Sequence, residues 1–294
     1  MLSDNLKSQL QLHLIVFIWG FTAILGKLIS LQALPLVWFR MLFAVGFIFL
    51  FIKIKKINIK VSKKAFIIFL LSGCIIALHW FTFFKAIKVS NVSVTLACLA
   101  TGSFFTAFLE PLFYKKKVVW YEVSFGLIVF FGLFLIFRVQ GNFIEGILLA
   151  LTSAFLSALF SVINSKLVKK HDATVLSLYE LLGGVLFFTL LLLFSNSFSS
   201  TFFQLSTNDF LYLMVLSSVC TAFAFIVSTQ VMKHLSPFTV MLTINLEPIY
   251  GILLALFFFK ESEKMNIEFY FGVVIILLSV VLNSILKAKK KQIN

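Results

Sequence analysis

Asn245, Glu247 and Tyr250 place an amide, a carboxyl and a phenol within a short, otherwise apolar stretch of the chain. Residues three apart on a helix share a face, so Glu247 and Tyr250 are expected to lie together. A carboxylate beside an amide and a phenol can bind an ammonium or hydroxyl group, and a protonated carboxyl can exchange a proton. Two interpretations of Glu247 stay open: a binding or proton-exchanging group, or a structural partner of Arg40 or of a backbone donor.

Pro248 follows Glu247 directly and has no N–H, so it cannot bond to the Ile244 carbonyl and is expected to interrupt a helix. Pro111 is expected to act in the same way on the Ala107 carbonyl. Interrupted helices expose polar backbone groups and accompany binding sites in many membrane proteins. The alternative is that both prolines only bend helices to fit a bundle.

Four further side chains are candidates for a binding cavity. Arg40 can attract an anionic group or pair with a carboxylate. His79 can relay protons, or it can serve as a hydrogen-bonded packing residue. Trp19 and Trp80 can floor a cavity for an aromatic or cationic ligand, although most aromatic residues of such a chain pack or face lipid.

The composition indicates which kind of fold must position these residues. The chain is 61% hydrophobic and 12% charged, whereas soluble domains carry about 25% charged residues. Its apolar residues come in long runs, which excludes the alternation of an outer-membrane β-barrel. We therefore predict an all-α integral membrane protein. Neither metal-ligand spacing nor a catalytic motif is present, so we expect no enzyme, no metal and no cofactor.

A bilayer core is crossed by about 20 apolar residues, and that length divides the chain into ten segments. Their approximate limits are 11–31, 35–53, 65–85, 92–113, 118–138, 143–166, 174–195, 209–232, 238–260 and 267–287. Glu247 is expected near the bilayer centre. Arg40 is expected near the outer end of its segment and Glu180 near the inner end, where both side chains can reach water.

The basic residues predict the orientation. Ten segments place both termini on one side, and that side receives eighteen basic residues against six on the other. Because cytoplasmic loops carry the excess of Lys and Arg, both termini are expected in the cytoplasm and the protein in the cell (inner) membrane, as a multi-pass protein. The net charge of +14 then reflects membrane orientation, and we expect no nucleic-acid partner.

The chain also shows an internal repeat. Shifts of 139 and 146 residues superpose its two halves, and they pair Lys27 with Lys166, Cys74 with Cys220 and Gly126 with Gly272. We expect two five-helix repeats, 1–141 and 142–294. Five is an odd number, so the second repeat enters the membrane inverted relative to the first, a recurring plan of secondary transporters. The shift also pairs Thr101 with Glu247, which predicts Thr101 on the opposite wall of a cavity.

Several motifs resemble the EamA branch of the drug/metabolite transporter superfamily. They are Trp19-Gly20-Phe21, Arg40, the stretch NLEPIYGILLALFFFKE from Asn245 to Glu261, and Gly272 beyond it. The first half departs from the pattern, because Lys115 matches Glu261 and Gly102 matches Pro248. The resemblance covers essentially the whole chain. It implies a central cavity, lined mainly by spans one to four and six to nine, that passes small metabolites, often outward.

Together these observations predict a secondary transporter. We expect a monomer in the lipid bilayer that moves a small-molecule substrate, such as an amino acid or a related compound, by alternating access, with protons as the candidate coupling ion. One alternative is a multidrug exporter of lipophilic cations. Others are an intramembrane lipid-handling enzyme or subunit, and a scaffold that transports nothing.

Overall fold

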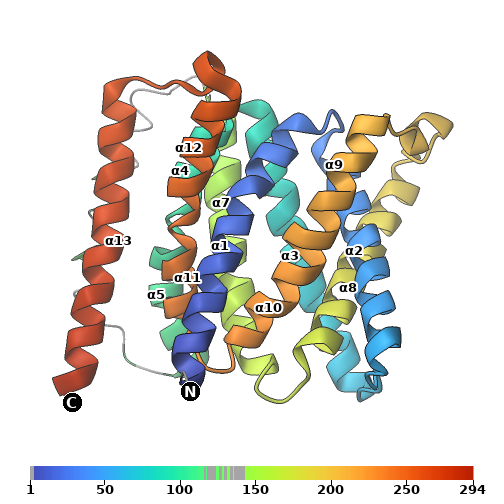
Figure 1. Ribbon diagram of the computed structural model, residues 1–294, viewed down its shortest axis with the longest axis horizontal. Helices are drawn as coiled ribbons and strands as arrows, with labels where there is room; N and C mark the ends of the chain where they lie inside the picture. The colour runs from blue at the N-terminus through green and yellow to red at the C-terminus, as the bar shows by residue number, and fades with distance from the viewer. Residues whose placement is uncertain are drawn as a thin grey trace.

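The computed structural model describes residues 3–115, 117 and 143–293, together with six separate residues within 118–142. Across these residues all the regular structure is helical. The helices are α1 Asp4–Leu28, α2 Ala33–Lys55, α3 Lys63–Val89, α4 Val92–Leu99, α5 Gly102–Tyr114, α7 Ile144–Leu167, α8 Ala173–Phe194, η2 Ser200–Phe203, α9 Thr207–Ser217, η3 Ser218–Phe223, α10 Ala224–Val231, α11 Pro237–Ile244, α12 Glu247–Phe259, η4 Lys260–Glu263 and α13 Ile267–Ile293. They form one bundle whose two termini lie at the same end (Figure 1).

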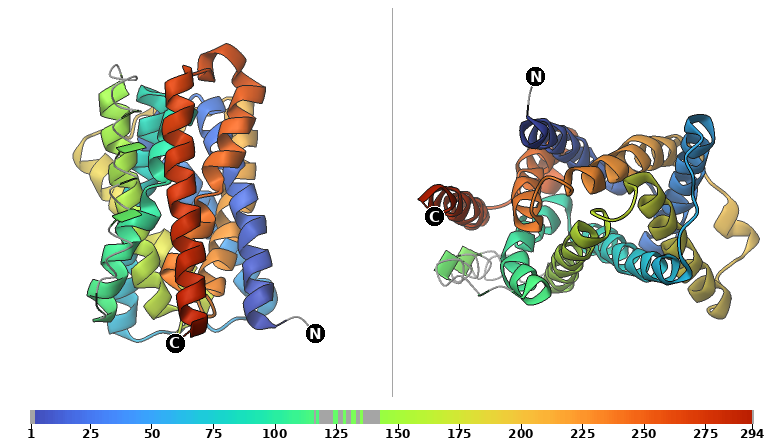
Figure 2. Two further views of the ribbon diagram at one scale, coloured as in Figure 1. Left: turned by 90° about the vertical axis from the view of Figure 1, so that its left-hand side faces the viewer. Right: turned by 90° about the horizontal axis from the view of Figure 1, so that it is seen from below.

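Eight helical stretches of the described chain are long and apolar enough to cross a membrane. They are Asp4–Leu28, Ala33–Lys55, Lys63–Val89, Val92–Tyr114, Ile144–Leu167, Ala173–Phe194, Thr207–Val231 and Pro237–Glu263. A shorter apolar stretch, Ile267–Ser279, begins α13, which lies at one edge of the bundle (Figure 2). The span predicted at 118–138 falls almost entirely outside the described residues.

Large apolar side chains cover the outside of the bundle. Phe194 is 87% exposed, Phe257 75% and Leu112 73%. An apolar surface of this kind is solvated by acyl chains, whereas in water it would drive association. The exposed aromatic and aliphatic residues therefore mark the lipid-facing side of the helices.

Local polar groups determine where several helices begin and end. The Ser62 hydroxyl accepts the Ala65 N–H at 3.2 Å, at the start of α3. The Asp172 carboxylate accepts the Thr174 N–H at 2.9 Å, at the start of α8. Lys56 ends α2 in the left-handed region, at φ 53°. These contacts satisfy backbone groups that the helix termini leave without partners.

Two of the membrane spans are each interrupted in their middle. One is broken at Ala100–Thr101, between α4 and α5, and the other at Asn245–Leu246, between α11 and α12. Each break holds a tight turn. The Thr101 N–H donates to the Cys98 carbonyl at 3.1 Å, and the Leu246 N–H to the Thr243 carbonyl at 3.0 Å.

The two prolines stand differently relative to these breaks. Pro248 lies in the first turn of α12, directly after the break. The N–H groups of a first turn make no hydrogen bond within the helix, so the missing N–H of proline costs no bond there. Pro111 lies inside α5, which continues to Tyr114. The prediction that Pro111 interrupts its helix is therefore wrong, and the break lies earlier, at Thr101. There the Thr101 hydroxyl also donates to the Cys98 carbonyl, at 2.8 Å.

A third irregularity lies in the span made by α9 and α10. The segment η3 is π-helical, and the Thr221 hydroxyl donates to the Leu216 carbonyl at 2.6 Å. Such bulges occur frequently at functional sites because they redirect side chains and carbonyls. Here the Cys220 carbonyl accepts the Trp19 Nε1–H at 3.2 Å.

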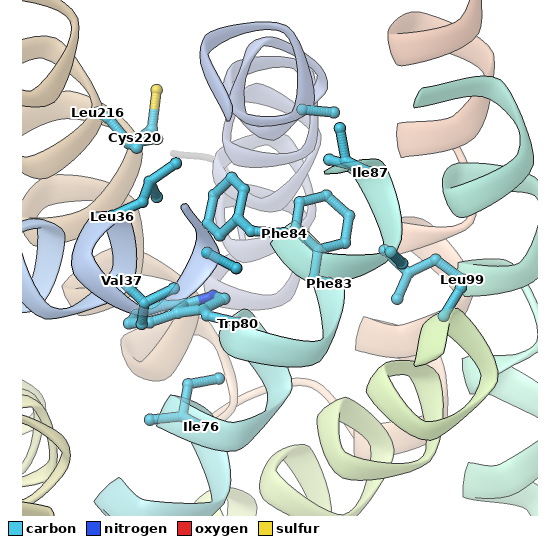
Figure 3. Close-up of a cluster of buried hydrophobic side chains, with 14 of the residues drawn as sticks. Leu36, Val37, Ile76, Trp80, Phe83, Phe84, Ile87, Leu99, Leu216 and Cys220 are labelled. Carbon is cyan, nitrogen blue, oxygen red and sulfur yellow. The ribbon is translucent and has the colours of Figure 1, made fainter. Parts of the chain in front are cut away.

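Glycine brings α3 and α8 into backbone contact. A β-carbon added at Gly73 would lie 1.9 Å from the Glu180 carbonyl oxygen, and one at Gly183 would lie 2.4 Å from the Leu70 carbonyl oxygen. No side chain fits in that space. The main apolar cluster includes Trp80, Phe83 and Phe84 of α3 together with Leu36 and Val37 of α2 (Figure 3).

Candidate functional site

A cavity lies in the interior of the bundle, between helices from both ends of the chain. It holds about 650 Å³ of space free of protein atoms, its open part included. Its lining comes from α1, α2, α3, α4, α7, α10, α11 and α12, with Met232 beyond the end of α10. The residues are Trp19, Thr22, Arg40, Ile76, His79, Trp80, Phe83, Leu99, Ser157, Phe160, Ser161, Phe225, Ser228, Met232, Met241, Ile244 and Glu247.

Arg40 brings a positive charge to the cavity. The side chain is buried, its Nε donates to the Thr221 hydroxyl at 2.6 Å, and its Cζ lies 4.0 Å from the centre of the Trp80 ring. Nη1 is buried and has no hydrogen-bond partner in the described part of the protein. A guanidinium stays protonated and presents five N–H donors. The cavity therefore contains a fixed cation that retains an open donor.

Glu247 brings a carboxyl to the same cavity. It begins α12, directly after the break, and is 6% exposed. Across the described residues, nothing donates a hydrogen bond to this carboxyl and no cation lies within the 4.0 Å of an ion pair. Arg40 acts on it electrostatically through the cavity. The cavity thus holds a guanidinium and a carboxyl that make no direct contact with each other.

Aromatic and hydroxyl groups complete the walls. Trp80 lies 5.6 Å from Phe225, ring centre to ring centre, and Phe160 stacks on Phe225 at 5.5 Å. The His79 Nδ1 lies 2.8 Å from the Ser153 hydroxyl and 2.9 Å from the Ser153 carbonyl oxygen. This ring nitrogen is therefore engaged by α7, which fixes the orientation of the imidazole at the cavity wall.

The family model for the EamA-like transporter family matches residues 6–138 and 144–285. The chain belongs to this family. It is a multi-pass membrane transporter, as the sequence motifs indicated.

One curated protein and one solved structure are similar to this chain along nearly its whole length. An uncharacterized transporter of Archaeoglobus fulgidus is 26% identical over 295 residues, covering 95% of this chain and 98% of its own length. A solved structure, described only as the crystal structure of a protein, superposes with a TM-score of 0.71 at 12% identity. It covers 95% of this chain and 98% of its own. At that identity the match concerns the fold alone.

The eight side chains predicted for a cavity divide into two groups in this EamA-like transporter. Those that line it are Trp19, Arg40, His79, Trp80 and Glu247. The other three make contacts elsewhere. The Asn245 Nδ2–H donates to the Ser103 hydroxyl at 2.9 Å, the Tyr250 ring lies edge-on against Phe17 at 5.4 Å, and the Thr101 hydroxyl is bound to its own helix.

The environments predicted for Arg40 and Glu180 are wrong. Both were expected to reach water near the ends of their spans, yet Arg40 is 1% exposed and Glu180 is completely buried. Arg40 points inward because α3 offers it an aromatic face and η3 a hydroxyl. Glu180 is held by the Asn164 Nδ2–H at 3.2 Å. Apolar runs indicate how far along a membrane-spanning helix a residue lies. The direction of its side chain depends on the neighbouring helices.

Several cavity residues were not singled out from the sequence as ligands. Ser157 and Ser161 lie on a face of α7 where small residues recur at every fourth position, a pattern more typical of close helix packing than of a binding site, yet both line the cavity. The spacing of the small residues along α7 was a partial sequence signal for this part of the cavity wall. Thr221 binds Arg40 because the π-helical turn η3 redirects the threonine side chain. No local sequence pattern predicts such a turn. Phe160 and Phe225 are two of 39 phenylalanines, so type alone could not distinguish them.

Carboxylates bind the first turns of both α4 and α11 in this transporter. Glu263, at the end of η4, accepts the Val92 and Ser93 N–H groups at 3.1 and 2.9 Å. It also forms an ion pair with Lys27 at 2.7 Å. At α11, the Phe238 N–H donates to Glu110 at 3.2 Å. Negative charge stabilises a helix N-terminus, so each broken span is tied to a carboxylate from the other.

Proposed function

We propose that this protein is a secondary transporter for small zwitterionic metabolites, amino acids or related compounds, and that it exports them across the cytoplasmic membrane by alternating access. The proposal rests mainly on the presence of both Arg40 and Glu247 in one cavity. Nη1 of Arg40 has no hydrogen-bond partner in the described structure. A ligand carboxylate satisfies the guanidinium, and a ligand ammonium satisfies the carboxyl.

The charge pattern favours a zwitterion over a singly charged ligand. A buried charge is stable only when it is paired and hydrogen-bonded. A ligand carrying both signs neutralises both protein groups at once, whereas a lipophilic cation leaves Arg40 without an anion. The apolar walls from Trp19, Trp80 and Phe225 then suit an apolar or aromatic side chain on the ligand.

The proposed architecture is ten spans in two inverted repeats, 1–141 and 142–294. Its main support is the pair of broken spans, whose helix limits differ by 145 residues throughout: 92 against 237, 99 against 244, 102 against 247 and 114 against 259. That offset is one residue less than the shift of 146 predicted from the sequence, so Gly102, and not Thr101, occupies the position that corresponds to Glu247. The family model also matches twice, and the two termini lie at the same end of the bundle. We place both termini in the cytoplasm, from the distribution of lysine.

Transport in this proposal is powered by proton entry, and the working unit is the monomer. Rocking of the two repeats about the shared cavity exposes it first to one side of the membrane and then to the other. The carboxylates at the first turns of α4 and α11 lie where such a movement would make and break contacts.

The test uses purified protein in liposomes and the exchange of radiolabelled L-phenylalanine. Unlabelled L-phenylalanine is compared as a competitor with phenethylamine, which lacks the carboxylate, and phenylpropanoate, which lacks the ammonium. Each analogue loses a hydrogen bond to a charged group, worth about 1.5–3 kcal/mol, so each is expected to compete roughly 10- to 100-fold more weakly.

Three outcomes would contradict the proposal. If no amino acid in a panel is exchanged, the substrate class is wrong. If phenethylamine and tetraphenylphosphonium compete as well as L-phenylalanine, the multidrug exporter is the better description. If Glu247→Gln folds normally and exchanges L-phenylalanine at the wild-type rate, the cavity is not the binding site.

A further inference from the structure

The buried carboxyl of Glu180 lies outside the cavity lining. Glu180 of α8 is completely buried, and its Oε2 accepts the Asn164 Nδ2–H at 3.2 Å. Its Oε1 has no hydrogen-bond partner among the residues that the structure describes. An isolated ionised carboxylate in an apolar interior is so unfavourable that the group is normally found neutral. The groups around Oε1 therefore decide whether the Glu180 carboxyl is charged or neutral.

Neutral polar groups surround it. The Ser72 hydroxyl lies beside the carboxyl, and Ser177 stands one helical turn before Glu180. Both hydroxyls and the Asn164 Oδ1 are buried and, in the described chain, without partners. A carboxylate brings only acceptors to such a cluster, whereas a carboxylic acid brings an O–H donor. The serine hydroxyls can donate as well as accept, whereas the Asn164 Oδ1 only accepts, so a proton on Glu180 adds one O–H donor to a cluster of neutral groups.

Among the residues that the structure describes, no charged side chain takes the place of that proton. The side chains that act on the Glu180 carboxyl are Ser72 and Asn164. Helix α10 carries no titratable group. The titratable groups within α8 and the other neighbouring helices form hydrogen bonds to other residues. They are Arg40 with Thr221, Cys74 with the Leu70 carbonyl, His79 with Ser153, Lys166 with the Phe113 carbonyl and Tyr179 with the Ile59 carbonyl. The lysines of α2 and α3 lie toward the helix ends.

A polar face of α7 runs from the cavity to this cluster. Ser157 and Ser161 line the cavity, and Asn164 follows Ser161 by three residues, so the three side chains share one face of the helix. The Ser161 hydroxyl has no partner in the part of the protein described. Groups that can both donate and accept therefore occupy the face of α7 between the cavity and Asn164, the residue that binds Glu180.

We propose that Glu180 is a proton-binding site distinct from the cavity, which takes up one proton as a carboxylic acid and releases it during each transport cycle. This inference rests on the proposed function and assigns its coupling ion to a particular residue. The proton binds Oε1 of the carboxylate and leaves by the same oxygen, with no other bond made or broken. The cluster also lies against the glycine contact of α3 and α8, where Gly73 touches the Glu180 carbonyl.

The test separates proton coupling from substrate binding. Wild type, Glu180→Gln and Glu247→Gln are compared in liposomes for exchange of L-phenylalanine without a pH gradient and for accumulation driven by an imposed pH gradient. We expect Glu180→Gln to retain exchange but to lose gradient-driven accumulation, down to the level of empty liposomes. Glu247→Gln is expected to lose both. Gradient-driven accumulation by Glu180→Gln at the wild-type level would overturn the inference.

A spectroscopic measurement needs no substrate. Infrared difference spectra of the wild type on titration should contain a protonated-carboxyl band that shifts in heavy water and is absent from Glu180→Gln. Glu180→Asp keeps a titratable carboxyl and should keep a band at a shifted pH, which covers the case in which the glutamine variant fails to fold. If the wild-type and Glu180→Asp spectra lack this band, the inference is wrong. If the band is present but L-phenylalanine is not exchanged, only the proposed substrate fails.

Discussion

The two broken spans share one backbone plan but differ in chemistry. Both have a first helix of eight residues and a second of thirteen. At the start of the second helix, one carries Gly102 and the other Glu247, followed by Pro248. Of these two positions, only that of Glu247 brings an ionisable group into the cavity. Backbone geometry can therefore be duplicated while the side-chain chemistry is kept in one copy.

The residues at the two breaks differ as well. The Thr101 hydroxyl donates to the Cys98 carbonyl at the end of α4, whereas the second break is followed by Pro248, whose missing N–H is not needed in the first turn of α12. The breaks then touch through Asn245 and Ser103. Gly102 admits a close neighbour there, since a β-carbon at that position would lie 2.5 Å from the Met241 methyl group. Side-chain contacts between the breaks hold them together.

The largest effect is expected at the N-terminus of α4. Glu263→Ala removes a buried carboxylate that binds two N–H groups and Lys27. Removing one partner of a buried ion pair costs about 3–5 kcal/mol. Because Lys27 is 27% exposed, the unfolding free energy in detergent should fall by about 3 kcal/mol, the lower end of that range. Glu261→Ala is the matched control, because its exposed ion pair with Lys264 is worth at most about 1 kcal/mol. Equal loss in both variants would contradict the role given to Glu263.

The next effect separates the two breaks by function. Glu247→Gln is expected to weaken binding of L-phenylalanine by roughly 10- to 100-fold, the value of a hydrogen bond to a charged group. Thr101→Val should change binding little, because its hydroxyl bonds within its own helix. Titration of tryptophan fluorescence measures both, since Trp19 and Trp80 line the cavity. A comparable loss in the two variants would place Thr101 in the binding site.

A smaller effect concerns the contact between the breaks. A double-mutant cycle of Asn245→Ala and Ser103→Ala should show coupling of about 0.5–1.5 kcal/mol in the free energy of unfolding. Asn245→Ala combined with Gln9→Ala, on the exposed start of α1, should be additive. Additivity in both cycles would mean that the 2.9 Å contact contributes nothing to stability.

The smallest effect is expected for Pro248→Ala. The first break forms without a proline, and Pro248 occupies a first-turn position whose N–H is not needed by the helix. The variant should lose about 0.4–1 kcal/mol, the entropic contribution of a compatible proline, and keep its exchange activity. A loss above about 3 kcal/mol in a thermal unfolding assay would show instead that the proline holds the break open.

Several features were accessible from sequence because they depend on short stretches of chain. Apolar runs indicate spans, and the missing N–H of Pro248 marked the region of one break. The other break was misplaced to Pro111, because α5 accommodates that proline and Thr101 gives a weaker local signal. Among the eight candidate residues, Asn245 and Tyr250 were grouped with Glu247 by spacing, but they pack against Ser103 and Phe17.

The sequence by itself determined that this chain is a membrane bundle with an EamA-like plan, since hydropathy and backbone hydrogen bonding act within a single span. Only the tertiary structure decided which polar groups meet. Arg40 reaches the cavity because Thr221, 181 positions away, binds it, and Glu180 is sealed by Asn164 and by the approach of α3. The rotation of each helix about its axis depends on packing with distant helices, and that information is spread over the whole chain.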